Sequence, residues 1–186
     1  IEDSRAEPFL QKIMRNDAAH YRLQVSAAGA LCRLGSPKAK REAQDFVMGM
    51  WQKAQEDDPA EAIRVTPFSR YVNTDFDIAL CEAGTPEAMA VIRMRLQGGL
   101  VTFMVINILD HLRKIDDPET VQVLYALARS TQNDLPVRIR SLELLLSVPN
   151  HVEKEAIRTI AENLRQYSLM QEIPDFQRRV NNILNA

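Results

Sequence analysis

Few side chains in this sequence could carry out nucleophilic, acid–base or metal chemistry. The histidines are His20, His111 and His151, and the cysteines are Cys32 and Cys81. None of the histidines has a second histidine or a cysteine at the short spacing of zinc-binding motifs. The sequence also contains no glycine-rich phosphate loop, nucleophile elbow or paired-carboxylate signature. It therefore predicts no metal site, no cofactor and no catalytic centre, although groups that only folding brings together would escape such a search.

Turn-forming residues recur along the chain and separate pairs of candidate helices. The turns are centred on Pro37, Pro86, Pro118 and Asn150, so the intervals between them are 49, 32 and 32 residues (86 − 37, 118 − 86 and 150 − 118). A constant period of this length is typical of repeat proteins. The longer first interval predicts an insertion at residues 52–66, between the first and second repeats. We interpret it as a solvated loop, with a contact loop for a basic partner as the alternative.

Apolar residues keep the same positions relative to each turn. Six residues before the turns stand four leucines: Leu31, Leu80, Leu112 and Leu144. Six residues after the turns stand small or branched apolar residues: Ala43, Ile92, Leu124 and Ala156. This spacing predicts one striped helix before each turn and another after it. Alternating runs that would predict strands are missing from the sequence.

Proline begins several of the second helices, directly after a residue that can cap them. Ser36, Thr85 and Asp117 precede the prolines of the first three turns, and such side chains accept hydrogen bonds from the first N–H groups of a helix. The predicted helices span residues 7–15, 18–34, 37–54, 67–83, 86–97, 100–114, 118–129, 136–147, 151–167 and 175–184. The sequence thus predicts an all-α fold.

Two stretches resemble a known family of helical repeats. The run from Tyr21 to Ala39, YRLQVSAAGALCRLGSPKA, is similar to the short HEAT repeats of bilin-lyase-type proteins. The run from Asn133 to Arg138, NDLPVR, resembles the Asp-x-x-Val-Arg opening of the same repeats. The resemblance covers about residues 18–164. It implies an α-α superhelix, a HEAT/armadillo-like solenoid of about four to five antiparallel helix pairs, over 1–186 as a single domain.

The resemblance also indicates where a partner would bind. HEAT repeats line their concave surface with their second helices, so the positions four and eight residues after each turn are the candidates for protein binding. These residues are Arg41, Asp45, Ala90, Met94, Gln122, Ala126, Lys154 and Arg158. Their mixture of charged, amide and apolar groups suits a protein or peptide better than a row of phosphates. A solvated face without a partner is the alternative for each of them.

Charge and composition separate the functions that such an array could have. The formal net charge is −2 and the isoelectric point is about 6.0, which disfavours nucleic acid as a partner. We expect a non-catalytic interaction scaffold or adaptor that binds a protein or peptide. A bilin-lyase-like enzyme is the alternative that the resemblance implies. A HEAT-like DNA glycosylase is disfavoured, because the chain is acidic and Trp51 is its only tryptophan.

The remaining expectations concern the cysteines, the compartment and the ends of the chain. Helices that stack about 8–10 Å apart hold cysteine Cα atoms too far apart for a disulfide, so Cys32 and Cys81 are expected to be reduced. The apolar run from Leu100 to Leu109 is half as long as the roughly 20 residues of a membrane span. We expect a soluble protein with the cytoplasm slightly favoured. Because the chain starts at Ile1 without a Met, the alternative is a processed N-terminus from which a signal peptide, tag or neighbouring domain was removed. The striped helix at 175–184 could support self-association.

Overall fold

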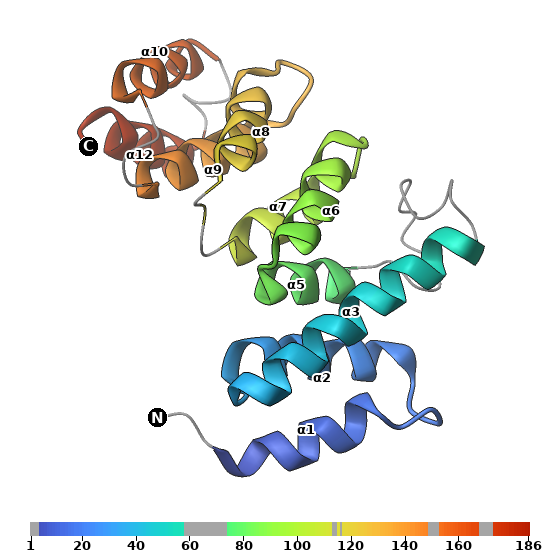
Figure 1. Cartoon of the computed structure of the whole chain (residues 1–186). Coiled ribbons are helices and arrows are strands. Elements are labelled where there is room, and N and C mark those ends of the chain that lie inside the picture. Colours follow the sequence, from blue (N-terminus) through green and yellow to red (C-terminus); the bar gives the residue numbers. More distant parts are fainter. Residues whose placement is uncertain (1–3, 58–73, 113–114, 116, 149–152, 168–172) are drawn as a thin grey trace. The chain divides into compact units, whose positions relative to one another are not determined.

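The computed structural model describes residues 4–57, 74–112, 115, 117–148, 153–167 and 173–186, and in them it contains helices and no strand (Figure 1). The all-α prediction is therefore confirmed. The helices are η1 (Ser4–Ala6), α1 (Glu7–Met14), α2 (Tyr21–Leu34), α3 (Pro37–Asp57), α5 (Thr74–Ala83), α6 (Pro86–Gln97), α7 (Thr102–His111), α8 (Pro118–Arg129), α9 (Leu135–Ser147), α10 (Lys154–Arg165) and α12 (Pro174–Leu184).

The chain divides into two compact units, Ile1–Lys114 and Ile115–Ala186, which are described one at a time. The boundary falls between α7 and α8, which the repeat pattern assigns to one helix pair. The single domain over 1–186 remains a prediction. Of the predicted insertion at 52–66, residues 52–57 form the last turns of α3, and the rest lie outside the described residues.

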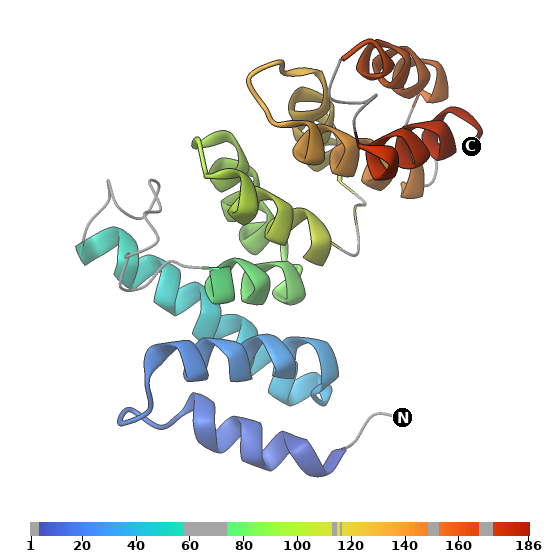
Figure 2. The ribbon, with the colours of Figure 1, turned by 180° about the vertical axis from the view of Figure 1, so that it is seen from behind.

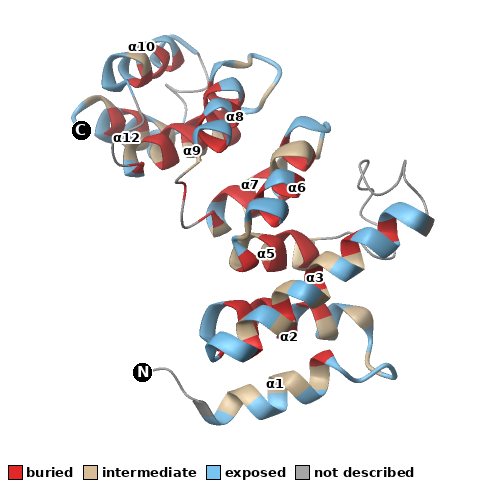
Figure 3. Ribbon diagram, in the orientation of Figure 1, coloured by how far each residue is buried: buried red, intermediate tan, exposed pale blue. Residues whose placement is uncertain are grey.

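The leucines that stand six residues before each turn all belong to the core. Leu31 and Leu80 are completely buried, Leu112 is 5% exposed and Leu144 is 6% exposed. In the first unit, Figure 3 shows buried residues on α2, α5, α6 and α7, whereas α1 is mostly half-buried or exposed. Burial of these side chains stabilises the helices by removing apolar surface from water.

In the first unit, α2 lies between α1 and α5 and also packs on α3 (Figures 1 and 2). Helices α2 and α5 run parallel, because Gly29 contacts Ala79 and, four residues further along α2, Arg33 forms an ion pair with Glu82. Arg33 and Glu82 are 49 residues apart, which equals the interval between the first two turns. Equivalent residues of two successive repeats therefore lie side by side.

Helix α3 runs antiparallel to α5. The Gln44 side chain donates a hydrogen bond to the Ala83 carbonyl at 2.9 Å, at the end of α5. The Trp51 ring stacks on Phe76 near the start of α5, with 6.2 Å between the ring centroids. Seven residues separate the two contacts on each helix, so they define one continuous antiparallel register.

In the second unit, α9 occupies the centre and packs on α8, α10 and α12, while α10 also packs on α12. The buried Arg138 of α9 donates from Nε to the Ala128 carbonyl at 3.0 Å, and its guanidinium lies 5.0 Å from the centroid of the Tyr167 ring. Arg138 is the arginine of the NDLPVR run. It ties the end of α8 to α9 and is a structural residue.

Helix α10 begins at Lys154 and not at residue 151, and α2 and α7 begin later than predicted for local reasons. Helix α2 begins at Tyr21 because His20 is its N-cap, with ring Nδ1 accepting a hydrogen bond from the Arg22 N–H at 3.3 Å. Helix α7 begins at Thr102 because the preceding Gly99 has a φ of +79°, and Val101 is still extended. A positive φ of this kind ends regular structure and favours glycine.

Candidate functional site

The eight candidate binding residues lie on the second helices, as two sets in the two units. Arg41 and Asp45 are on α3, and Ala90 and Met94 are on α6, all in the first unit. The second unit holds the rest of them: Gln122 and Ala126 on α8, and Lys154 and Arg158 on α10. Met94 is half-buried and the other seven are exposed. Their exposure agrees with their places in the repeat, but binding by them remains a prediction.

The helical period explains why these residues face solvent. In α3, Ala39, Ala43 and Val47 are completely buried, and the exposed Arg41 and Asp45 stand between them along the sequence. Residues four apart on a helix share a side, whereas residues two apart point to different sides. The side of α3 that packs into the core is therefore different from the side that exposes Arg41 and Asp45 to solvent.

Three of the charged candidates make exposed polar contacts. Arg41 donates from Nε to the Pro37 carbonyl at 3.3 Å, one turn earlier in α3. Lys154 donates from Nζ to the Ala186 carbonyl at 3.3 Å. Arg158 and Glu162 form an ion pair at 3.8 Å on the surface of α10. Exposed contacts of this type are weak, so a partner could replace them with little loss.

A groove between α2 and α5 is a second surface feature, and the sequence did not predict it. Its volume is about 150 Å³. It is lined by Val25, Ser26, Gly29, Ala30 and Arg33 of α2 and by Asp75, Ile78, Ala79 and Glu82 of α5. The one signal in the sequence is the run of small residues in α2, which leaves room beside α5.

A buried ion pair joins α5 to α6. Arg95 donates from Nε to Oδ1 of Asp77 and from Nη2 to Oδ2 at 2.8 Å, and both side chains are 1% exposed or less. Burial raises the pKa of the Asp77 carboxyl, and the hydrogen bonds and charge of Arg95 oppose that rise. Because neither side chain reaches solvent, the pair positions the two helices and does not contact a ligand.

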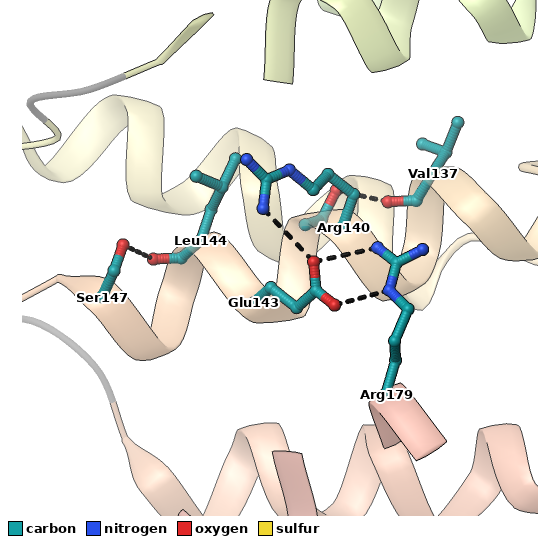
Figure 4. Close-up of polar contacts among 7 residues, drawn as sticks. Val137, Arg140, Glu143, Leu144, Ser147 and Arg179 are labelled. Carbon is teal, nitrogen blue, oxygen red and sulfur yellow. Dashed lines mark hydrogen bonds and ion pairs between the residues drawn. The ribbon is translucent and has the colours of Figure 1, made fainter. Parts of the chain in front are cut away.

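A second ion-pair cluster joins α9 to α12 (Figure 4). The Glu143 carboxylate lies between two arginines: Arg179 donates to it at 2.6 and 2.9 Å, and Arg140 at 3.3 Å. Burial raises the pKa of Glu143, but the hydrogen bonds and charges of Arg179 and Arg140 outweigh it, so the pKa is lowered. The cluster is a clamp between helices, since the Glu143 carboxylate of α9 pairs with Arg179 of α12.

The histidines and cysteines form no reactive centre in the described part of the chain. His20 caps α2, His111 contacts the Asn107 carbonyl at 2.8 Å, and His151 lies outside the described residues. Both cysteines are free thiols, and burial raises the pKa of Cys32 to about 12 and also raises that of Cys81. High thiol pKa values make both poor nucleophiles.

The described residues contain neither a candidate metal site nor a candidate membrane span. Nowhere in them do three or more histidine, cysteine, aspartate or glutamate side chains gather in a way that could hold a metal ion. None of the helices described is both long and apolar enough to cross a membrane.

The comparisons with known proteins place the chain in no family. No family model, no curated protein and no solved structure matches it. The resemblance to HEAT repeats therefore rests on the sequence pattern alone.

Proposed function

We propose that this protein is a non-catalytic interaction scaffold, an α-α superhelix of the HEAT/armadillo type that binds a protein or peptide partner along its second helices. The observation that carries the proposal is the parallel stacking of α2 and α5. Arg33 and Glu82, which occupy equivalent positions in successive repeats, lie 3.5 Å apart, as expected for helices repeated by translation. In such arrays the first helices form one layer and the second helices form the other.

The chemistry of the second-helix surface supports binding in preference to catalysis. Arg41 and Asp45 are exposed on α3, Ala90 is exposed on α6, and Met94 of α6 is half-buried. Such a mixture of exposed charges and a half-buried methionine is a usual composition for a protein contact, because methionine offers adaptable apolar area. The described histidines make contacts within their own helices, and both cysteines are free thiols with raised pKa values.

A binding experiment with two matched quadruple variants tests the proposal. The first variant carries R41A, D45A, M94A and R158A, all on second helices. The control carries R22A, D110A, L23A and R178A, which remove the same kinds of side chain from exposed positions of α2, α7 and α12. Each substitution at an exposed position changes stability by at most about 0.5 kcal/mol, and only the half-buried Met94 should cost more, so all three proteins should fold.

Immobilised wild type, variant and control are compared for proteins that they retain from a lysate of the source cells. We expect the control to retain as much of the partner protein as the wild type does. The second-helix variant should retain at least tenfold less of it. Equal retention by both variants would contradict the proposal. Retention of a linear tetrapyrrole in place of a protein would support the enzyme alternative.

A further inference from the structure

Helix α1 is attached to the first unit by fewer buried side chains than the other helices of that unit. Among its residues only Met14 is buried, at 2% exposure, whereas α2, α5, α6 and α7 each bury several. Leu10 and Ile13 are half-buried, and Phe9 is 65% exposed. Figure 3 shows the same difference between α1 and its neighbours. Segments with few buried apolar contacts are those that open most readily.

Polar contacts on the surface hold the two ends of α1 against the neighbouring helices. At the first end, the Glu7 carboxylate accepts hydrogen bonds from the Ser36 N–H at 2.7 Å and from the Ser36 hydroxyl at 2.9 Å, directly before α3 begins. At the other end, Arg15 donates to the two carboxylate oxygens of Glu42 at 2.5 and 2.6 Å. The Arg15 side chain is 59% exposed and that of Glu42 is 30% exposed. Exposed pairs of this kind contribute little, so α1 is held weakly.

Helix α1 also depends on α2 for its own end. The Gln24 side-chain amide donates hydrogen bonds to the Met14 carbonyl at 3.3 Å and to the Asn16 carbonyl at 3.1 Å. Carbonyls at a helix end lack donors within the helix, so Gln24 supplies them. With 8 residues, α1 is shorter than the roughly 12–15 residues that an isolated helix needs in water. Once α1 leaves α2 and α3 it therefore unfolds, and release and unfolding are a single event.

The other helices of the first unit pack on one another without α1. Helix α2 packs on α3 and α5, and α5 packs on α6 and α7. Leu31 of α2, Leu80 of α5 and Ile108 of α7 are completely buried, and the Asp77–Arg95 pair joins α5 to α6. These contacts remain when α1 leaves, so the rest of the unit keeps its core.

We propose that α1 is a displaceable strap, which lifts off α2 and α3 and unfolds as one unit while α2, α3, α5, α6 and α7 stay folded. Opening removes the Glu7 carboxylate from Ser36 and the Arg15 guanidinium from Glu42. The side of α2 and α3 that α1 covers in the closed form then meets solvent. Local opening of this kind needs less free energy than unfolding of the whole unit. The strap is thus a conformational switch that is separate from the proposed second-helix surface.

Hydrogen exchange of the full chain, followed by NMR at low concentrations of urea, tests the proposal. The probes are the amides of Lys12, Ile13 and Arg15, and the references are the amides of Leu31 and Leu80. We expect the probes to exchange at least about a hundredfold faster than the references. The probe rates should change little with urea, because opening of α1 exposes little surface, whereas the reference rates should rise steeply. If probes and references have the same rate and the same urea dependence, α1 opens only with the whole unit and the proposal is wrong.

Three variants make the result specific to the strap. Glu42→Gln weakens only the attachment of α1, so it should accelerate exchange of the probes about two- to fivefold and leave the references unchanged. Glu56→Gln is the matched control, because this exposed carboxylate of α3 lies about 21 Å further along the helix and should change neither set. Met14→Ala removes the buried side chain of α1 and should accelerate the probes at least about thirtyfold, again without effect on the references. Equal acceleration of probes and references in Met14→Ala would overturn the proposal, and so would unchanged exchange of the probes.

Discussion

At the scale of single residues, Gly29 determines how closely α2 and α5 approach. Its missing side chain allows the contact with the Ala79 backbone, where an added Cβ would lie 3.3 Å from a Cα. Gly49 offers the opposite case, because it is exposed on α3 and an added Cβ would meet nothing within 4 Å. Two glycines in helix interiors therefore differ only in whether another backbone is near.

We expect substitutions at these glycines to change stability in opposite directions. Gly29→Val forces α2 and α5 apart and should lower the free energy of unfolding by about 1–3 kcal/mol, the usual effect of overpacking. Gly49→Ala should raise it by about 0.5–1 kcal/mol, because alanine favours the helix. Urea denaturation followed by circular dichroism measures both. A Gly29→Val protein as stable as the wild type would show that the two helices separate freely.

The buried Asp77–Arg95 ion pair should be costly to break at one residue but not to replace at both. Arg95→Met leaves a buried carboxyl without its partner guanidinium, so it should lower the free energy of unfolding by about 3–5 kcal/mol. The double variant Asp77→Leu/Arg95→Met removes both charges and should recover most of that loss. Denaturant midpoints of the two proteins give the comparison. If the double variant were as unstable as Arg95→Met, the shape of the pair and not its charge would be what stabilises α5 against α6.

At the scale of helices, the clamp between α9 and α12 should make stability depend on pH. The Glu143 pKa is lowered from its ordinary value of 4.5, so the folded state binds this proton less readily than the unfolded state. Its contribution is therefore present above about pH 4.5 and is lost as the pH falls through the lowered pKa. Protonation breaks the pairing with both arginines.

The free energy of unfolding of the wild type and of Glu143→Gln, measured at pH 7 and at pH 3, tests this dependence. We expect the variant to be less stable at pH 7, by about 1–2 kcal/mol, and the difference to shrink by at least half at pH 3. Glu162→Gln removes an exposed carboxylate of α10 and should give a small difference at both values. A difference between wild type and Glu143→Gln that stays constant from pH 7 to pH 3 would mean that the carboxylate is not ionised in the clamp.

The helices could be predicted from the sequence where their start signals are local. Helices α6 and α8 have the predicted bounds, because Thr85 and Asp117 cap them and proline follows directly. Helix α3 runs beyond its predicted end to Asp57, since no glycine or proline stops it at residue 54. The groove could not be predicted, because it depends on α2 lying beside a helix 49 residues further along the chain.

At the scale of the whole molecule, the repeat pattern and the division into units give different pictures of cooperativity. The pattern continues across the boundary at 114/115, since Leu112 and Leu124 keep their expected places before and after the Pro118 turn. Each unit nevertheless has a buried core of its own, with Leu80 in the first and Leu142 in the second, both completely buried. In repeat proteins, contacts between neighbours decide whether unfolding spreads.

Hydrogen exchange of two matched core variants will show which picture governs unfolding. Leu80→Ala and Leu142→Ala each remove a fully buried leucine, which costs about 2–5 kcal/mol. We expect Leu80→Ala to accelerate amide exchange in α2, α5 and α7 while α8, α9 and α10 keep wild-type protection, and Leu142→Ala to do the reverse, because each unit opens as its own cooperative segment. If either variant accelerates exchange equally in all these helices, the chain unfolds as the single repeat domain that its sequence predicts.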